Sequence, residues 1–413
     1  MTRARAVCAV ALLALLAGGS AALTDGRAAH SSSGATIQIG ALLDLKSGWT
    51  SLGRASRVTL RLAAADAGAT RVRLRIVDVQ GNPDLAVREL RRLAASGVHV
   101  VIGPESSAEV RAVRAAAESL GVVVVSQGST AHSLAISGDN VFRLVPDDRR
   151  EAEAMVALLK RDGVKAIVPV WREDPGNAGL VTSVRSRFSA QGGSVAAGVQ
   201  YGAAETTFKD VVPELRKQAA AARKGGTKVG VYLAGFDEVV DLFHAVAKDP
   251  VLRSVPWYGS DGVALSRKLV ADRAAASFAA ARGYPNPILG LDSTAVKRSA
   301  PVRRRAHARL GHDPDAFALT AYDALRIAVR AAARAGGAAH TRRFARAFAR
   351  TANGYRGVSG TIRLNAAGDR SYGSYDFWSV CAKGSSFVWR RTFTYIATGV
   401  GRGQIVKRQG CAA

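Results

Sequence analysis

Short runs of β-branched residues alternate with longer segments rich in Ala, Leu and Arg along most of the chain. In the first third, the runs have the length of buried strands, and the segments repeat apolar residues at the spacing of one helix face. Strands are predicted at residues 37–43, 71–79, 98–102 and 122–126. Helices are predicted at residues 55–67, 83–95 and 107–120. This alternation predicts a parallel sheet with helices on both of its faces.

The same alternation starts again after a strand predicted at residues 140–145. Further helices are predicted at residues 150–160, 178–191, 208–222 and 237–247. Further strands are predicted at residues 166–170, 194–199, 229–233 and 257–258. A second lobe is expected on length alone, because single hydrophobic cores stop growing at about 250 to 300 residues and this chain has 413.

The last part of the chain departs from this alternation. Residues 284–287 break a helix, and the helical segments that follow, including residues 314–334, have no strands between them. We expect these helices to return to the first lobe. The tail is strand-like again, at residues 361–364, 375–380 and 387–394.

The predicted fold class is α/β, with two doubly wound parallel-sheet lobes joined by a three-strand hinge. The three crossings are expected near Pro146, Tyr284 and Gly357. Lobe 1 is predicted to comprise residues 36–146 plus 285–357, and lobe 2 residues 147–284 plus 358–413.

Residues 1–22 have the pattern of a secretory signal peptide. A basic start is followed by an apolar run at residues 7–17 and by small residues at 19–22. The run is shorter than the roughly 20 residues that cross a bilayer. Cys8 lies inside it, which disfavours a lipid-anchored cysteine. Residues 23–35 are predicted to be a flexible leader, and the protein is expected to be exported to the periplasm or the extracytoplasmic cell surface.

The formal net charge of +26 changes the picture little. Nucleic-acid binders gather basic residues on one face, often with aromatic side chains among them. Here Arg is spread along the whole chain, as at Arg88, Arg91 and Arg92 of one predicted helix. We interpret the charge as a solvated cationic surface, and no nucleic-acid partner is expected.

Cys381 and Cys411 are the only cysteines outside the predicted signal peptide. An oxidising compartment favours a disulfide between them. Two unpaired thiols are the alternative.

No catalytic motif is present in the sequence. It has no G-x-S-x-G, no phosphate-binding P-loop, no G-x-G-x-x-G after a strand and no H-E-x-x-H. We therefore expect no enzyme activity, no cofactor and no metal site, and we interpret the histidines as structural or surface residues.

Four polar segments follow predicted strands, at the sheet edge where open α/β sheets bind ligands. They are residues 44–49 with Ser47 and Trp49, residues 103–107 with Ser106 and Ser107, residues 126–130 with Gly128, Ser129 and Thr130, and residues 258–262 with Asp261. Hydroxyls and helix-start N–H groups suit a carboxylate, and a carboxylate side chain suits an ammonium. The alternatives are an ordinary loop, a helix N-cap and simple turns.

In these segments the sequence resembles the type I periplasmic binding proteins, in the leucine/isoleucine/valine-binding branch of ABC-transporter receptors. The resemblance spans nearly all of the chain after the predicted leader. It is carried by Ile39-Gly40, Ser47-Gly48, Val77-Asp78, Asn82-Pro83, Val101-Ile102-Gly103, residues 121–126, Tyr322-Asp323-Ala324, residues 357–364 and Gly368-Asp369.

The resemblance implies roles for the candidate residues. The ligand carboxylate would bind at Ser107, Gly128, Ser129 and Thr130, and the ligand ammonium at Asp261, where the family's amino-acid binders carry Glu. By the same resemblance, Phe236 would cover the ligand side chain. The family commonly has Tyr-Gly near residues 171–179, where this chain has Asp-Pro-Gly-Asn at 174–177. Trp49 and Trp171 are candidate replacement aromatics.

The implied function is that of an ABC-transporter substrate-binding protein, which captures a branched-chain or other small amino acid by hinge closure. The implied partners are the membrane permease and ATPase subunits, and the protein is expected to be a monomer. One alternative is a receptor of the same fold for an amide, urea or an aromatic acid. Others are a sensory ligand-binding subunit not coupled to transport, and a polyanion binder driven by the net charge.

Overall fold

The computed structural model describes residues 36–68, 70–291, 293–408 and 410–411. The predicted signal peptide at residues 1–22 and leader at 23–35 lie outside the described residues, as does Cys8. No helix in the described part of the chain is long and apolar enough to cross a bilayer.

The first lobe is built on a five-stranded parallel sheet of order β2-β1-β3-β4-β5. Its strands are β1 (Thr36–Leu43), β2 (Arg71–Asp78), β3 (Val100–Ile102), β4 (Val123–Ser126) and β5 (Val141–Arg143). Side chains alternate between the two faces, so that Ile39 and Leu42 enter different cores. Strand β2 lies on one side of β1 and β3 on the other, so the strand order reverses at β1. In open α/β sheets, ligands bind at the carboxyl ends of the strands that flank such a reversal, which here are β1 and β3.

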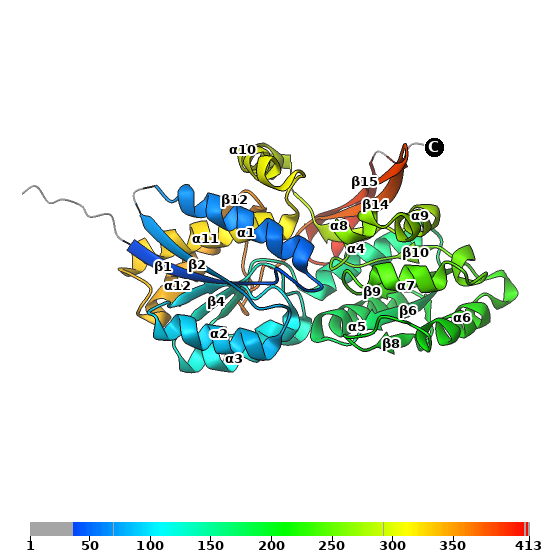
Figure 1. Ribbon diagram of the computed structural model, residues 1–413, viewed down its shortest axis with the longest axis horizontal. Coiled ribbons are helices and arrows are strands. Elements are labelled where there is room, and N and C mark those ends of the chain that lie inside the picture. Colours follow the sequence, from blue (N-terminus) through cyan, green and yellow to red (C-terminus); the bar gives the residue numbers. More distant parts are fainter. Residues whose placement is uncertain (1–35, 69, 292, 409, 412–413) are drawn as a thin grey trace, which may run out of the picture. The chain divides into compact units, whose positions relative to one another are not determined.

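Helices cover both faces of this sheet (Figure 1). One face packs against α1 (Thr50–Ala65), α11 (Ala316–Ala335) and α12 (Thr341–Ala352). The other packs against α2 (Pro83–Ala95) and α3 (Ser107–Ser119). The helix expected at residues 314–334 therefore does return to the first sheet, together with α10 (Ser293–Leu310).

The second lobe has a parallel sheet of order β10-β9-β6-β7, with β8 also paired to β6. Its strands are β6 (Ala166–Arg172), β7 (Ser194–Val195), β8 (Val199–Tyr201), β9 (Val229–Ala234) and β10 (Trp257–Tyr258). One face packs against α4 (Asp148–Arg161) and α5 (Pro175–Ala190). The other packs against α6 (Val211–Ala222), α7 (Val239–Val246) and α9 (Arg273–Arg282). Short helices are η1 (His132–Leu134), η2 (Lys224–Gly226), η3 (Leu252–Ser254) and α8 (Arg267–Ala271).

A third, antiparallel sheet was only partly predicted. Its order is β11-β14-β15-β16, with β11 (Asn286–Leu289), β14 (Tyr375–Lys383), β15 (Ser386–Gly399) and β16 (Arg402–Lys407). Residues 286–287 belong to a strand, although the sequence indicated only a helix-breaking stretch. A strand can hold Pro287 there because β11 is an edge strand, where a missing N–H leaves no ladder bond unmade.

The hairpin of β12 (Tyr355–Gly357) and β13 (Gly360–Ile362) lies against the first lobe. The Asp323 carboxylate of α11 accepts hydrogen bonds from the backbone N–H groups of Val358 (2.9 Å) and Ser359 (2.8 Å). Ile362 is buried in the same core. The hairpin therefore packs with the first lobe beyond Gly357, the position at which the sequence placed the last crossing between the lobes. The lobe boundaries as a whole stay a prediction.

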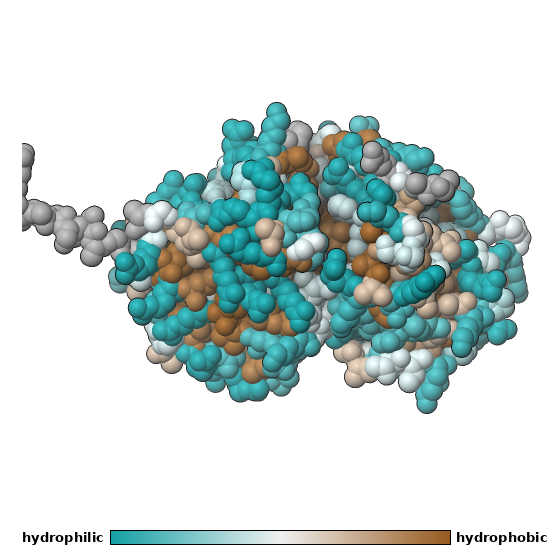
Figure 2. Space-filling model, turned by 45° about the horizontal axis from the view of Figure 1, so that its top comes forward, coloured by the Kyte–Doolittle hydropathy of each residue, from teal (hydrophilic) through white to brown (hydrophobic). Residues whose placement is uncertain are grey.

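Hydrophilic residues cover most of the face seen in Figure 2. The helix-surface arginines Arg88, Arg91 and Arg92 are exposed, in line with a solvated cationic surface. In the tail, Cys381 and Cys411 are joined by a disulfide, with their Cα atoms 5.3 Å apart.

Candidate ligand-binding site

Two hydroxyl groups meet where β3 and β4 end. Ser107, the first residue of α3, lies with its Oγ 3.0 Å from the Oγ of Ser129, and both side chains are buried. The backbone N–H of Ala131 donates to Ser107 Oγ at 3.2 Å. Thr130 follows directly in the same loop. We call Ser107, Ser129 and Thr130 the hydroxyl cluster.

The Ser126 side chain forms hydrogen bonds that fix the loop after β4. Its hydroxyl accepts from the backbone N–H of Ser129 (3.0 Å) and of Gly128 (3.4 Å) and donates to the carbonyl oxygen of Pro104 (2.7 Å). A Cβ at Gly128 would lie 2.9 Å from the Trp49 ring and 3.0 Å from the Glu105 carbonyl oxygen. Gly128 is therefore required for this close approach, and its N–H already has an acceptor.

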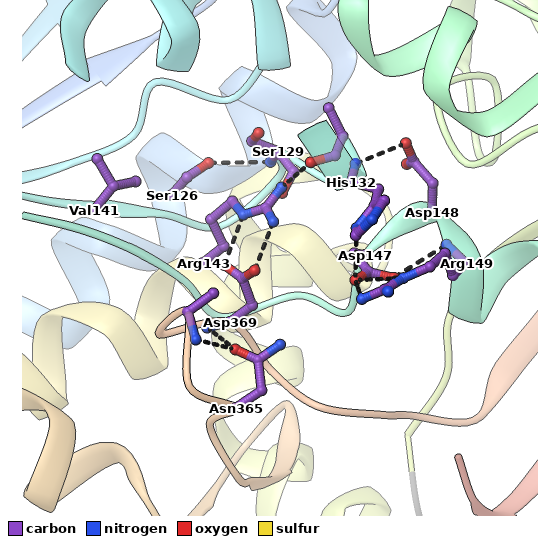
Figure 3. Close-up of polar contacts among 12 residues, drawn as sticks. Ser126, Ser129, His132, Val141, Arg143, Asp147, Asp148, Arg149, Asn365 and Asp369 are labelled. Atoms are coloured by element: carbon purple, nitrogen blue, oxygen red, sulfur yellow. Dashed lines mark hydrogen bonds and ion pairs between the residues drawn. The ribbon is translucent and has the colours of Figure 1, made fainter. Parts of the chain in front are cut away.

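Arg143 fixes the same loop to the segment that follows β13 (Figure 3). Its buried guanidinium donates from Nε and Nη2 to the two carboxylate oxygens of Asp369, at 2.7 and 2.6 Å. Nη1 donates to the Ala131 carbonyl oxygen at 2.6 Å. A bidentate Arg–carboxylate pair is rigid as well as strong. The hydroxyl cluster thus sits on a fixed support.

Two of the predicted ligand contacts have local partners. Ser106 caps α3, since its Oγ accepts from the Glu109 N–H (3.3 Å) while its own N–H donates to the Glu109 carboxylate (3.3 Å). This is the N-cap role that the sequence left open as the alternative. The Ser47 hydroxyl donates to the Asp44 carboxylate, which also accepts the Ser47 N–H at 3.0 Å.

The two predicted aromatic residues contact each other. Trp49, in the loop after β1, meets Phe236, in the loop after β9, edge to face with ring centroids 4.9 Å apart. Phe317 stacks on Trp49 at 6.1 Å, and the Arg172 guanidinium lies 5.0 Å from the centre of the Phe236 ring. Loops of both lobes are therefore joined by an apolar contact beside the hydroxyl cluster.

Asp261 lies in a group of three buried carboxylates, of which the sequence indicated only Asp261. Its backbone N–H donates to Glu151 Oε1 at 3.2 Å. Asp148, the first residue of α4, donates its N–H to the Thr130 carbonyl oxygen at 2.9 Å, and its Oδ2 accepts from the His132 N–H at 3.3 Å (Figure 3). The three are at most 7% exposed. We call them the acid cluster.

Burial raises the pKa of all three carboxyls of the acid cluster. Mutual repulsion adds to the effect, because Asp261 raises the pKa of both Asp148 and Glu151. None of the three forms an ion pair with a described residue, and Arg143, whose charge reaches Asp148, is committed to Asp369. The site is therefore short of positive charge.

Sequence reasoning missed Asp148 and Glu151. A signal was present for Glu151, because it lies on the same helix face as the buried Met155 and Leu158, at spacings of four and seven residues. A carboxylate on an apolar stripe is unusual and points to a partner. Asp148 could not be singled out from the sequence, because it directly follows Asp147, another acidic residue, which is the N-cap of α4.

The Asp-Pro-Gly-Asn segment, where the sequence departs from the resemblance, begins α5. The Asp174 carboxylate accepts from the Asn177 backbone N–H (2.9 Å) and side-chain amide (2.6 Å), and Pro175 occupies the first helical position. The segment is thus a helix start at the edge of the site. A Cβ at Gly176 would lie 3.3 Å from Ser107 Oγ, so this start approaches the hydroxyl cluster closely.

Two further observations concern metal binding and the position of a large cavity. Within the described residues, no group of three or more His, Cys, Asp or Glu side chains is arranged to hold a metal ion. A cavity of about 910 Å³ lies elsewhere, lined by residues that include Leu52, Ile288, Trp378 and Trp389, and it contains none of the predicted ligand contacts. The contact of the predicted residues with a ligand stays a prediction.

The fold is similar to several solved solute receptors. The leucine-binding protein LivK of Thermotoga maritima has a TM-score of 0.72 at 20% identity, covering 86% of this chain and 97% of that one. The branched-chain amino acid substrate-binding protein LivJ of Streptococcus pneumoniae, in complex with isoleucine, has a TM-score of 0.70 at 17% identity, covering 90% and 100%. A solute-binding protein of R. palustris, in complex with benzoate, has a TM-score of 0.71 at 18% identity, covering 86% and 96%. At these identities the likeness establishes the fold.

The sequence itself is 23% identical to an uncharacterised protein of Methanocaldococcus jannaschii over 377 residues, which cover 85% of this chain and 88% of that protein. The family model for periplasmic binding proteins matches residues 36–383, from the start of β1 to the end of β14. This match spans both parallel sheets, the hydroxyl cluster and the acid cluster. The chain therefore belongs to the periplasmic binding protein family and has its type I fold.

Proposed function

We propose that this protein is the extracytoplasmic substrate-binding subunit of an ABC transporter and that it captures a small amino-acid-like ligand. The observation that carries the proposal is the pairing of two opposite kinds of site. Buried hydroxyl groups lie at the start of α3. The buried acid cluster adjoins them, because the Asp148 N–H donates to the Thr130 carbonyl oxygen. A zwitterion offers the matching carboxylate and ammonium.

Binding is proposed to use movement of the lobes about the hinge. The candidate residues bury one another, and Trp49 contacts Phe236 directly, so a ligand can reach them only when these loops separate. The ligand carboxylate then binds Ser107 and Ser129 on the first lobe. Closure brings Asp261 to the ammonium and excludes water, which strengthens the charge pair. The closed form is what the permease and ATPase subunits recognise.

Family membership supports an extracytoplasmic location, and the pattern of residues 1–22 supports export by a signal peptide. We propose a monomer that works with a separate membrane permease and its ATPase.

The ligand class is argued from charge. The leucine-binding and isoleucine-bound relatives support an amino acid, whereas the benzoate-bound relative and the cluster of Trp49, Phe236 and Phe317 support an aromatic acid. A benzoate-like anion carries no cation, and beside it the three buried carboxyls could avoid the cost of an unpaired charge only by binding protons. An ammonium-bearing ligand is therefore favoured, and the aromatic acid is the second candidate.

The test is a thermal-shift screen of ligand-free mature protein against amino acids, amides, urea and aromatic acids. A ligand that binds only the native state raises the melting temperature, by an amount that grows with its concentration relative to Kd. We expect shifts with a set of amino acids. Shifts with aromatic acids or amides alone would transfer the role to the second ligand class, and no shift with any compound would contradict the proposal.

Asp261→Ala is expected to abolish binding of zwitterionic amino acids while leaving the fold intact. Losing one partner of a buried charge pair costs about 2 to 5 kcal/mol of binding free energy, a loss of affinity of about thirtyfold or more. Isothermal titration calorimetry measures the effect. The control is Asp315→Asn, which neutralises a buried carboxylate outside the site and keeps the N-cap of α11, where Asp315 accepts the Ala318 N–H at 2.9 Å. Unchanged affinity in Asp261→Ala contradicts the assigned role.

A further inference from the structure

The acid cluster holds more carboxylates than one ammonium requires. A single ammonium is matched by one carboxylate, and the proposed function assigns that role to Asp261. Glu151 and Asp148 remain, both fully enclosed. Two additional buried carboxyls without a cationic partner are costly unless something neutralises them.

The arginines around the cluster do not supply that charge. Arg143 is held by Asp369 in a bidentate pair. Arg150, the neighbour of Glu151 in sequence, pairs with Glu153. Arg172 faces Asp174 at 3.6 Å and Glu238 at 3.5 Å. Each of these guanidinium groups therefore has its own carboxylate partner.

A second, independent feature marks the same place. Tyr232, on β9, is completely buried, and its hydroxyl has no hydrogen-bond partner in the described structure. Burial raises the pKa of this phenol, and the charges of Glu151, Asp261, Asp148 and Tyr284 raise it further, so the hydroxyl lies in the field of the acid cluster. One oxygen of Asp148, Oδ1, also lacks a hydrogen-bond partner. Both atoms can accept N–H donors, and buried polar atoms of this kind usually have them.

The arrangement also indicates what kind of cation would suit these three carboxylates. The three carboxylates are not grouped so as to hold one metal ion. Asp148 and Glu151 are one turn apart on α4, and Asp261 comes from the loop after β10. Positive charge spread along an organic molecule matches such a set better than a point charge does.

We propose that the ligand carries two cationic groups, as a basic amino acid or an aliphatic diamine does, and that Glu151 and Asp148 hold the second cation with the Tyr232 hydroxyl beside them. This inference rests on the proposed function and narrows its ligand class. It retains Asp261 as the partner of the first ammonium, and it makes the neutral branched-chain amino acids weak ligands.

The experiment titrates three probes into ligand-free mature protein by calorimetry: L-ornithine, putrescine and L-leucine. We expect ornithine or putrescine to bind about thirtyfold or more tightly than leucine, the factor typical of one additional buried charge pair. Tighter binding of ornithine than of putrescine identifies a basic amino acid, whose carboxylate uses the hydroxyl cluster. The reverse order identifies a diamine.

Glu151→Gln tests the residue itself. It keeps the size of the side chain, and we expect it to lower the affinity for the dicationic probe about tenfold or more beyond any loss of affinity for leucine. Asp148→Asn is the second variant, in case the first fails to fold, and Asp315→Asn is the matched control that should change neither affinity.

The outcomes distinguish a failure of this inference from a failure of the proposed function. Tight leucine binding, with no binding of ornithine or putrescine, overturns the inference and leaves the proposed function standing. Equal effects of Glu151→Gln on leucine and on the dicationic probe also overturn it. No binding of any of the three probes contradicts both the inference and the amino-acid-like ligand on which it rests.

Discussion

Glu105 is a buried carboxyl that joins three segments of the first lobe. Its Oε2 accepts the Asp44 N–H at 3.0 Å, and its Oε1 accepts the Ser56 hydroxyl at 2.9 Å and the Gln127 side-chain amide at 3.1 Å. Burial raises the pKa of Glu105 to about 8, and the charges of Asp44 and Glu109 add to the increase. The protonated carboxyl thus ties the loop after β1, helix α1 and the loop after β4 together beneath the hydroxyl cluster.

Glu105 makes the stability of the protein depend on pH. Its pKa is higher in the folded protein, about 8, than the ordinary value of 4.5. The stability contributed by this group is therefore fully present below pH 4.5 and is lost as the pH rises through about 8. At about 1.4 kcal/mol for each pH unit between the two pKa values, the loss is of the order of 5 kcal/mol.

Glu105→Gln is expected to remove this dependence, because an amide does not ionise and can bond both Ser56 and Gln127. Urea unfolding at pH 5 and at pH 8 measures it, with Glu118→Gln on the exposed end of α3 as the control. The variant should gain stability relative to wild type as the pH rises. The same wild-type-to-variant difference at both pH values would show that Glu105 does not titrate in this range.

For single residues, the sequence predicted at which strand end a side chain lies better than it predicted which other residues that side chain contacts. Ser107, Ser129 and Asp261 were found because they follow strands, and the structure does bring them to the ends of β3, β4 and β10. Glu151 could not be found by that rule, because it lies within a helix. Its importance appears only when Asp261, more than a hundred positions away in sequence, is seen to donate its N–H to it.

Among the elements, α3 shows how a helix start and a ligand site can share residues. Ser106 and Glu109 form a capping box, each side chain meeting the other's backbone N–H. Ser107, the next residue, faces Ser129. The cap therefore orients the first turn that carries the hydroxyl cluster.

Ser106→Ala is expected to cost about 1 kcal/mol of folding stability, the usual penalty for losing a serine N-cap. Ser119→Ala, at the exposed other end of α3, is the control and should change stability by less than about 0.5 kcal/mol. Thermal and urea unfolding of both variants measure these changes in stability. Equal effects of the two substitutions would mean that the capping box contributes nothing measurable.

Elements with local signals were predicted closely, and those that depend on distant partners were not. Helix α2 spans the predicted residues 83–95, because Asn82 and Pro83 mark its start. Strand β16 was missed, since residues 402–407 are mostly exposed and are ordered by pairing with β15. Strand β11 carries proline, and only the presence of β14 makes it a strand.

On the scale of the whole molecule, the disulfide fixes the tail to the third sheet. Cys381 of β14 and Cys411 lie 30 positions apart in the chain. A crosslink over a loop of that length stabilises a protein by about 3 kcal/mol, mainly by restricting the unfolded chain.

Replacing both cysteines by serine is expected to lower the free energy of unfolding by about 3 kcal/mol without changing ligand affinity, since the bond is remote from the acid cluster. Wild-type protein treated with a reductant should show the same loss of stability. Stability that is insensitive to both changes would mean that the folded protein in solution does not contain the bond.

The pairing of β11 with β14 also bears on when the protein can fold. While the chain is being synthesised, β11 has no neighbour until residues 375–383 have been made, and one face of the first sheet is covered only by α1 until α11 is complete. Contacts of such long range form slowly. The first lobe therefore cannot be completed until these late segments have been made, which favours the proposed export before folding is complete. A chain cut before residue 375 would lack β14, and residues 286–289 would then be without the partner strand that orders them.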